Sequence, residues 1–99
     1  MFFNKFFTKR KAKKEAMNFL GEHLIRMIDE TSKRGDLYCR IEMKDNYYNK
    51  CFCEEIKNVF TYINKKSYPA QDFYTVYVGP GISSINGSEI LCLQIEWLF

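Results

Sequence analysis

The sequence predicts an α+β fold in which two helices pack on one face of a three-stranded mixed sheet. Two long segments carry apolar residues at helical spacing, residues 8–34 and 48–66. Three shorter segments alternate or are rich in β-branched and aromatic residues, 37–43, 73–78 and 89–99. Glycine, proline and asparagine separate these segments. The expected order is helix-strand-helix-strand-strand in a single domain, as is usual for a chain of 99 residues.

The first helix is expected to bury one apolar stripe. Its members recur at three- and four-residue spacings: Ala16, Met17, Leu20, Leu24, Met27 and Ile28. Lys33 and Arg34 suit the negative end of the helix dipole, and Gly35 suits the left-handed residue that often follows a helix. The helix should therefore end at about Arg34.

The next strand and helix have clear inward faces. The strand alternates, with one face formed by Leu37, Cys39, Ile41 and Met43 and the other by Tyr38, Arg40 and Glu42. After a turn at Asp45 and Asn46, a helix is expected from Tyr48 or Asn49 to about Lys66. Its inward side chains should be Phe52, Ile56, Val59, Phe60 and Ile63.

The last two strands are expected to form a hairpin. Its loop should lie between Gly79-Pro80-Gly81 and Asn86-Gly87-Ser88. The final strand should direct to one face Leu91, Leu93, Ile95, Trp97 and Phe99, and to the other Ile90, Cys92, Gln94, Glu96 and Leu98. A right-handed crossover would make the first two strands parallel, with the last strand between them. This arrangement is the basis of the mixed-sheet prediction.

The charge is divided unevenly between an N-terminal arm, residues 1–14, and a body, residues 15–99. The arm has six cationic residues and no acidic residue, whereas the body has nine cationic and twelve acidic residues. Such a basic segment is typical of a contact with an anionic partner, and a merely solvated terminus is the alternative.

The arm also carries four phenylalanines, Phe2, Phe3, Phe6 and Phe7, beside Lys9, Arg10, Lys11, Lys13 and Lys14. In a helix, their spacing would form one apolar edge next to a basic flank. This edge could dock on the body, enter a groove of a partner, or lie on an anionic membrane surface. The cations could also neutralise nucleic-acid phosphates. The plain structural alternative is that the arm extends the first helix over the core.

The remaining chemistry-bearing residues do not form a recognisable catalytic or metal-binding motif. Acid–base catalysis usually needs clustered titratable groups, and His23 is the single histidine. Cys39 and Cys92 fall on strands and are interpreted as packing residues. Cys51 and Cys53 would point about 200° apart on a helix, which is poor geometry for a shared metal ion. We therefore expect no enzyme activity, no metal site and no cofactor.

No signal peptide or stretch of about 20 apolar residues is apparent, so reduced thiols and a cytoplasmic location are expected.

The segment from Arg34-Gly35-Asp36 to Leu93-Gln94-Ile95-Glu96-Trp97 resembles a group of small phage-encoded α+β proteins. Their pattern is helix-strand-helix-strand-strand with a last strand that ends in Ile-x-Trp, and the likeness covers about residues 17–98. It departs at Ser67-Tyr68-Pro69, where the group usually has Gly-Tyr. The resemblance implies a phage origin, a location in the infected bacterial cytoplasm or in the virion, and no active site.

These observations together predict a non-enzymatic phage accessory protein that acts through protein–protein contacts, either as a virion component or as a binder of a host factor. Partners would be another protein or a second copy, and the predicted contacts are the arm and an aromatic sheet face with Tyr38, Arg40 and Tyr74. The alternative function is association with nucleic acid or a membrane surface through the arm.

Overall fold

The computed structural model describes the backbone of residues 2–98 and the side chains of residues 5–98. Along this part of the chain lie α1 (Phe2–Phe19), the π-helical turn η1 (Leu20–Leu24), α2 (Ile25–Lys33), β1 (Tyr38–Met43), α3 (Tyr47–Ser67), β2 (Tyr74–Ile82) and β3 (Glu89–Trp97). The fold is α+β, as predicted. The predicted side chain of Phe99 lies outside the described residues.

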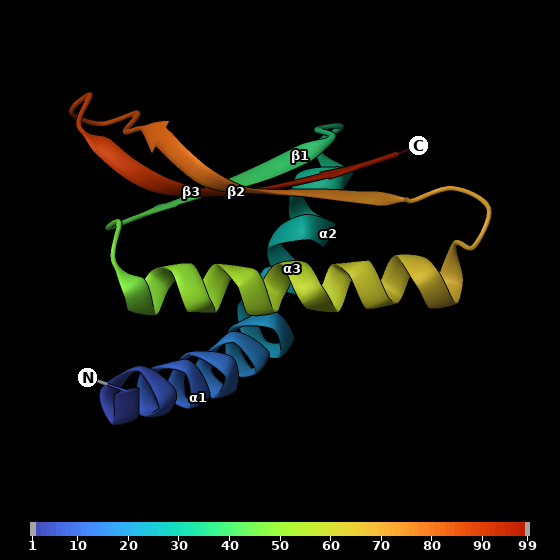
Figure 1. Cartoon of the computed structure of the whole chain (residues 1–99). Coiled ribbons are helices and arrows are strands. Elements are labelled where there is room, and N and C mark those ends of the chain that lie inside the picture. The colour runs from blue at the N-terminus through green and yellow to red at the C-terminus, as the bar shows by residue number, and fades with distance from the viewer. Residues whose placement is uncertain (1, 99) are drawn as a thin grey trace.

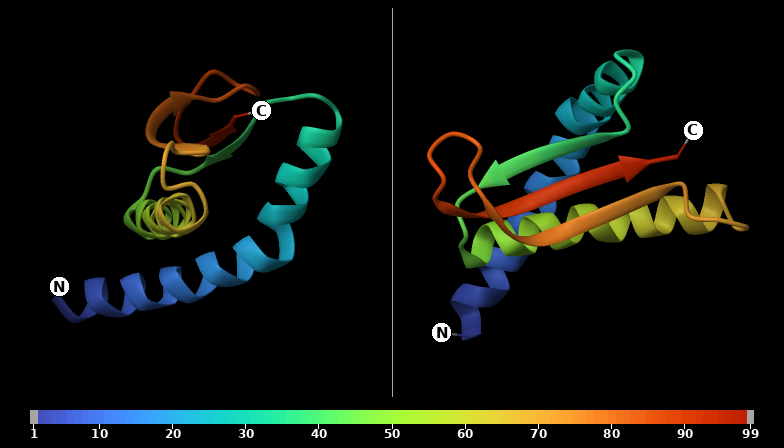
Figure 2. Two further views of the ribbon diagram at one scale, coloured as in Figure 1. Left: turned by 90° about the vertical axis from the view of Figure 1, so that its right-hand side faces the viewer. Right: turned by 90° about the horizontal axis from the view of Figure 1, so that it is seen from above.

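The elements are stacked in three layers (Figure 1). The sheet covers one side of α3, and α1 crosses the opposite side of α3. The helical segment then bends at η1, and α2 rises beside α3 to reach β1 (Figure 2). Both helices were predicted to pack directly on the sheet. Both do lie on the same side of it. However, the first predicted helix is divided: α1 packs on α3, and its continuation α2 contacts the sheet, at β1.

The sheet is antiparallel, so the prediction of a mixed sheet is wrong. The strand order is β1-β3-β2, and β3 pairs antiparallel with both neighbours. β1 and β2 do run in the same direction with β3 between them, as the crossover argument required. Because the central strand runs the other way, no two parallel strands share hydrogen bonds.

The first helix begins well before the predicted Thr8. Residues 2–14 contain no glycine or proline and are rich in lysine, a good helix former. Ala12 and Ala16 are fully buried against α3, whereas Met17, predicted to face inward, is exposed. Small alanine side chains allow the two helices to approach closely. The helix ends as predicted, with Gly35 at a φ of 89°.

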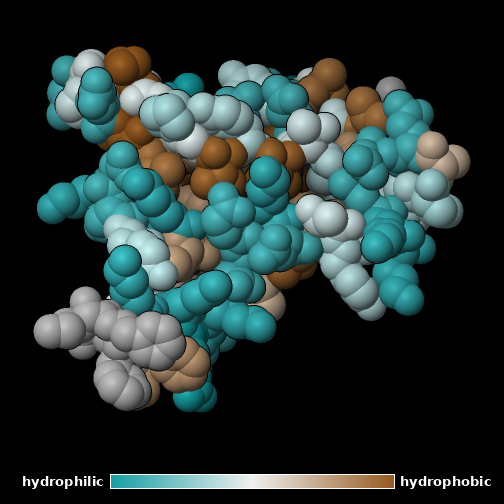
Figure 3. All heavy atoms as spheres, viewed as in Figure 1, coloured by the Kyte–Doolittle hydropathy of each residue, from teal (hydrophilic) through white to brown (hydrophobic). Residues whose placement is uncertain are grey.

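The core lies between α3 and the sheet. Ile56 and Phe60 of the predicted α3 face are buried there, together with Leu93 and Ile95 of the central strand. On the face seen in Figure 3, hydrophobic side chains come to the surface between the sheet and α3, and mainly hydrophilic side chains surround them. The inward faces predicted for α3 and β3 are confirmed.

A buried asparagine joins α3 to β2. Asn64 is 7% exposed. Its amide nitrogen donates to the Tyr74 carbonyl at 2.7 Å, and its amide oxygen accepts from the Tyr74 N–H at 2.9 Å. The helical periodicity placed Asn64 next to the inward face, but its polar side chain gave no reason to expect burial.

β2 is longer than predicted, because the segment Gly79-Pro80-Gly81 is part of the strand. Proline is tolerated at a sheet edge, where an N–H that points to solvent is not needed. A Cβ atom at Gly81 would lie 3.1 Å from the Cys92 Cβ and 3.3 Å from the Arg40 Nη2 atom. A larger residue here would push these neighbours back by a few tenths of an ångström, so the close packing favours glycine.

The end of the β2–β3 hairpin is fastened to β1. Arg40 Nη2 donates to the Ile82 carbonyl at 2.9 Å, and Arg40 Nε lies 3.1 Å from Glu42 Oε2. The Ser84 N–H donates to the Glu42 carboxylate at 3.1 Å. We call these contacts of Arg40, Glu42, Ile82 and Ser84 the hairpin clasp. It lies beside Cys92, which is only 3% exposed.

The hairpin clasp should loosen when Glu42 is protonated. The Ser84 N–H, and to a smaller extent Arg40, lower the pKa of Glu42. The clasp therefore contributes stability above the unfolded-state pKa of Glu42, and loses it as the pH falls through the folded-state pKa. An NMR titration of the Ser84 amide should show a transition with a midpoint below the ordinary glutamate value, which Glu42→Gln abolishes. A midpoint at or above the ordinary value would contradict this assignment.

Candidate functional site

The exposed side of α1 is the strongest candidate for a contact surface. We define the α1 surface as Phe6, Phe7, Lys9, Arg10, Lys11, Lys13 and Lys14, all of them exposed. Phe6 is 50% and Phe7 60% exposed, and their rings meet edge to face with centroids 5.7 Å apart. Arg10 lies over the Phe6 ring at 5.8 Å. The predicted side chains of Phe2 and Phe3 lie outside the described residues.

The cations of this surface have no carboxylate partner among the side chains of residues 5–98. The ion pairs found there involve other residues, such as Lys33 with Asp29 and Arg40 with Glu42. On α1, Lys9 and Lys13 share one row at four-residue spacing, and Arg10 and Lys14 share the next. The phenylalanines occupy the beginning of the helix and the cations follow, which leaves a positive potential beside an apolar tip.

Contacts with α3 hold α1 in place. The Tyr48 hydroxyl donates to the Glu15 carboxylate, and the Phe19 and Phe52 rings lie 5.5 Å apart. Lys5 lies over the Tyr47 ring at 5.7 Å. The arm and the body were predicted to divide at residue 14, and that boundary falls within the continuous helix α1.

The ionisation of Tyr48 reports on the contact between α1 and α3. Partial burial, then the hydrogen bond to Glu15, raises its pKa to about 12. The stability that this shift represents is complete below the unfolded-state value of 10.0 and is lost as the pH rises towards 12. The part of the tyrosinate absorbance that is lost in Tyr48→Phe reports on Tyr48, and it should therefore appear near pH 12 in the unaltered protein. Glu15→Gln should lower the pH at which this absorbance appears. If the component lost in Tyr48→Phe titrated near pH 10 instead, the contact between Tyr48 and Glu15 would not form.

The second predicted surface is the open sheet face, formed by Tyr38, Arg40, Glu42, Thr75, Tyr77, Gln94 and Glu96, which turns away from α3. Tyr38 is 52% exposed, and Arg40 belongs to the hairpin clasp. The prediction for Tyr74 is wrong, because this side chain packs in the core with its ring 4.8 Å from that of Phe60.

Tyr77 is the tyrosine that β2 contributes to the open sheet face. It is 50% exposed, and it lies opposite Gln94, which in turn lies opposite Arg40. Residues 73–78 are aromatic or β-branched at every position, so alternation could not assign their faces. The pairing with β3 assigns the faces, because Tyr74 lies opposite the buried Trp97.

The residues considered for catalysis and metal binding lie apart. His23 is exposed on η1, with its Nε2 atom 3.9 Å from a Glu22 oxygen. Cys53 is buried with its sulfur 3.5 Å from that of Met43, and burial raises its pKa to about 12, so a reactive thiolate is disfavoured. Cys51 is only partly buried. Among the described residues, no three His, Cys, Asp or Glu side chains are grouped to hold a metal ion.

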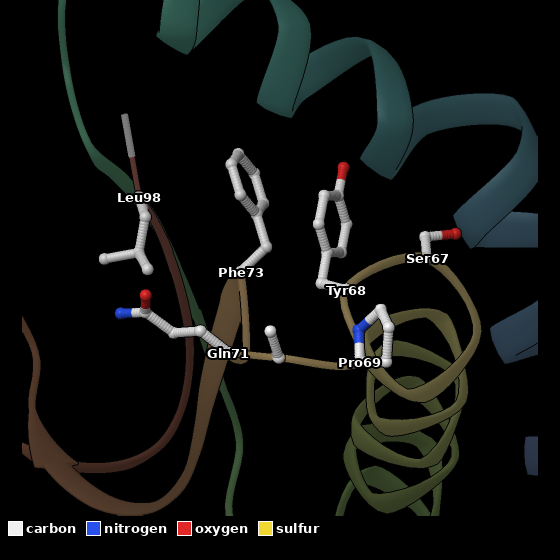
Figure 4. A pocket seen from close by; sticks show the side chains of 7 residues that line it. Ser67, Tyr68, Pro69, Gln71, Phe73 and Leu98 are labelled. Carbon is white, nitrogen blue, oxygen red and sulfur yellow. The ribbon is translucent and has the colours of Figure 1, made fainter.

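An open apolar pocket of about 690 Å³ lies where α3 leads into β2. Figure 4 shows the rings of Tyr68 and Phe73 side by side, with Leu98 on the other side of Phe73. The two rings stack at 4.7 Å and an interplanar angle of 18°. The helix was predicted to end at about Lys66, and nothing in the sequence pattern indicated this pocket.

Across the described residues, no helix is sufficiently long and apolar to cross a membrane. No protein-family model, curated protein or solved structure matches the chain. The resemblance to small phage proteins therefore stays a prediction.

Proposed function

We propose that this protein is a non-enzymatic accessory protein that acts through protein–protein contact, with the α1 surface as its docking element for an acidic partner. The observation that carries this proposal is that exposed Phe6 and Phe7 lie on the same helix as a row of cations. These cations have no carboxylate partner in the described part of the chain. A protein with an apolar groove and an acidic rim would satisfy both groups. The expected phage origin directs the search for this partner to phage and host proteins.

Aromatic side chains contribute most of the energy at many interfaces when they are buried in a pocket, whereas charges at the rim mainly raise the association rate. The geometry of the α1 surface supports this division, because Phe6 and Phe7 lie near the start of the helix and the cations flank them. Since α1 is already helical and is held by α3, docking would not require the helix to fold on binding.

The test is to capture partners with the full chain and then to reconstitute the complex from purified components. Lys9→Glu/Lys13→Glu should weaken the reconstituted complex by about tenfold or more, because two attractive charges become repulsive. The matched control is Arg26→Glu/Lys44→Glu, which makes the same charge change at exposed positions away from α1. Equal affinity for both variants would refute docking through α1.

Nucleic acid is the second candidate partner, favoured by the two adjacent cationic rows on α1. A nucleic-acid complex should weaken steeply with salt and should tolerate Phe6→Ser/Phe7→Ser, since phosphate contacts need only the cations. Binding of the purified protein to anionic vesicles, with loss of binding when the phenylalanines are replaced, would instead identify a membrane surface.

A further inference from the structure

We propose that the outer edge of β2 is a second binding site, which takes an extended acidic segment of a partner protein as an added strand. The strand order β1-β3-β2 leaves β2 at one edge of the sheet. Figure 1 shows this edge towards the viewer, above α3, while α1 lies on the far side of α3. The site is therefore separate from the α1 surface.

The buried Asn64 shows that this edge accepts strand-like pairing. Its side-chain amide donates to and accepts from the backbone of Tyr74, at 2.7 and 2.9 Å, as a residue of a neighbouring strand would. The N–H and C=O of Tyr74 thus point away from β3. Asn64 occupies only this first position of the edge.

The positions that follow Tyr74 are available. Backbone groups alternate in direction along a strand, so Val76 and Val78 direct their N–H and C=O to the same outer side as Tyr74. In the described part of the chain, the backbone N–H and C=O groups of Val76 and Val78 form no hydrogen bond with a side chain or with a segment outside β2 and β3. Pro80 ends this window, because it has no N–H to donate.

A groove accompanies the free edge. A cavity of about 200 Å³ is lined by residues of α3 and β2, among them Lys57, Thr61 and Val76. A neighbouring cavity of about 330 Å³ shares Thr61 and adds Lys65. In the view of Figure 3, hydrophobic side chains run along the sheet edge above the hydrophilic side chains of the helix. An added strand would place every second side chain in this groove.

The charge of the groove selects an acidic occupant. Lys57 and Lys65 lie on one row of α3 with Thr61 between them, all exposed, and neither lysine forms an ion pair within the described residues. Asp72 is the single carboxylate that lines the two cavities. A second copy that paired through its own β2 is a poorer occupant, since β2 (Tyr74–Ile82) has no charged residue to offer these lysines.

The probe is a synthetic peptide of about seven residues, a common strand length, in which valine alternates with glutamate. The matched peptide has lysine in place of glutamate. Each is titrated into the full chain with NMR detection of backbone amides. The glutamate peptide should shift and protect the amides of Val76 and Val78, and the lysine peptide should bind about tenfold more weakly or worse, because charge attraction becomes repulsion.

Variants separate this site from its alternatives. Lys57→Glu/Lys65→Glu should reverse the preference between the two peptides, while Arg26→Glu/Lys44→Glu should leave it unchanged. Phe6→Ser/Phe7→Ser should bind the glutamate peptide as the unaltered protein does, so that failure of the α1 proposal leaves this one standing. Shifts confined to other residues, equal binding of both peptides, or dimerisation through β2 without peptide would each overturn the proposal.

Discussion

Phe60→Asp is expected to abolish cooperative folding. Phe60 is 3% exposed between α3 and the sheet, with its ring 4.8 Å from that of Tyr74. Removal of a buried phenylalanine side chain alone costs about 3–5 kcal/mol, and burial of an unpaired carboxylate adds to this cost. The whole free energy of unfolding of a domain is about 5–15 kcal/mol. Thermal denaturation followed by circular dichroism should show no cooperative transition.

Tyr62→Asp is the matched control for Phe60→Asp. Tyr62 belongs to the same helix but is 61% exposed, so its replacement should change the free energy of unfolding by about 0.5 kcal/mol or less. If Phe60→Asp melted as cooperatively and at the same temperature as Tyr62→Asp, the core between α3 and the sheet would be wrongly placed.

Asn64→Leu should be nearly as damaging, although leucine has the same number of side-chain heavy atoms, branched at the same carbon. The change leaves both the N–H and the C=O of Tyr74 without the amide that now pairs with them. Each unsatisfied buried polar group costs about 1–3 kcal/mol, so a loss of about 2–6 kcal/mol is expected for the two groups. Chemical denaturation should show the loss as a lower midpoint with an unchanged slope.

Asn58→Leu makes the same chemical change at an exposed position of α3 and should be close to neutral. A loss below about 1 kcal/mol for Asn64→Leu would mean that water replaces the amide at Tyr74. The edge of β2 would then be more open than the Asn64 contact indicates.

Periodicity predicted the parts of the fold that bury one clear face. The inward residues of α3 repeat at helical spacing, and β1 alternates apolar and polar residues, so the inward positions of both elements were predicted. The exception is Leu37, which was predicted to face inward but lies just before β1 and is 52% exposed. The antiparallel pairing of β3 with β1 could have been predicted too. The first two strands were expected to run in the same direction, and the last strand in the opposite direction between them, so it had to pair antiparallel with both. The prediction of a mixed sheet overlooked that this arrangement contains no parallel strand pair.

Local patterns could not predict features that depend on tertiary contacts. The continuation of β2 through Gly79-Pro80-Gly81 requires an edge position, and local turn signals pointed to a loop instead. The burial of Asn64 depends on its meeting Tyr74, and the layer formed by α1 depends on Ala12 and Ala16. Helical spacing places Ala16 and Asn64 on or beside apolar faces, but it does not show which element each side chain meets.

The sequence predicted most of the residues of the candidate site, but not how all of them are arranged in the fold. The cations and Phe6 and Phe7 are exposed on α1, where the sequence placed the contact. Tyr77, rather than Tyr74, lies on the open sheet face, because an unbroken run of β-forming residues hides the direction of each side chain. The β2 edge and its groove depend on the strand order and had no local signal.

The most direct measurement is a titration of the purified partner with the Phe6→Ser/Phe7→Ser protein. Both side chains are exposed, so their replacement should leave the fold intact. Met17→Ser/Ile25→Ser is the control, because it removes two other exposed apolar side chains from the same helical segment. If α1 docks by its apolar tip, affinity should fall about a hundredfold for the phenylalanine variant, as for interface hot spots, and hardly change for the control. Equal affinities for the two variants would contradict docking of the α1 surface on a protein partner.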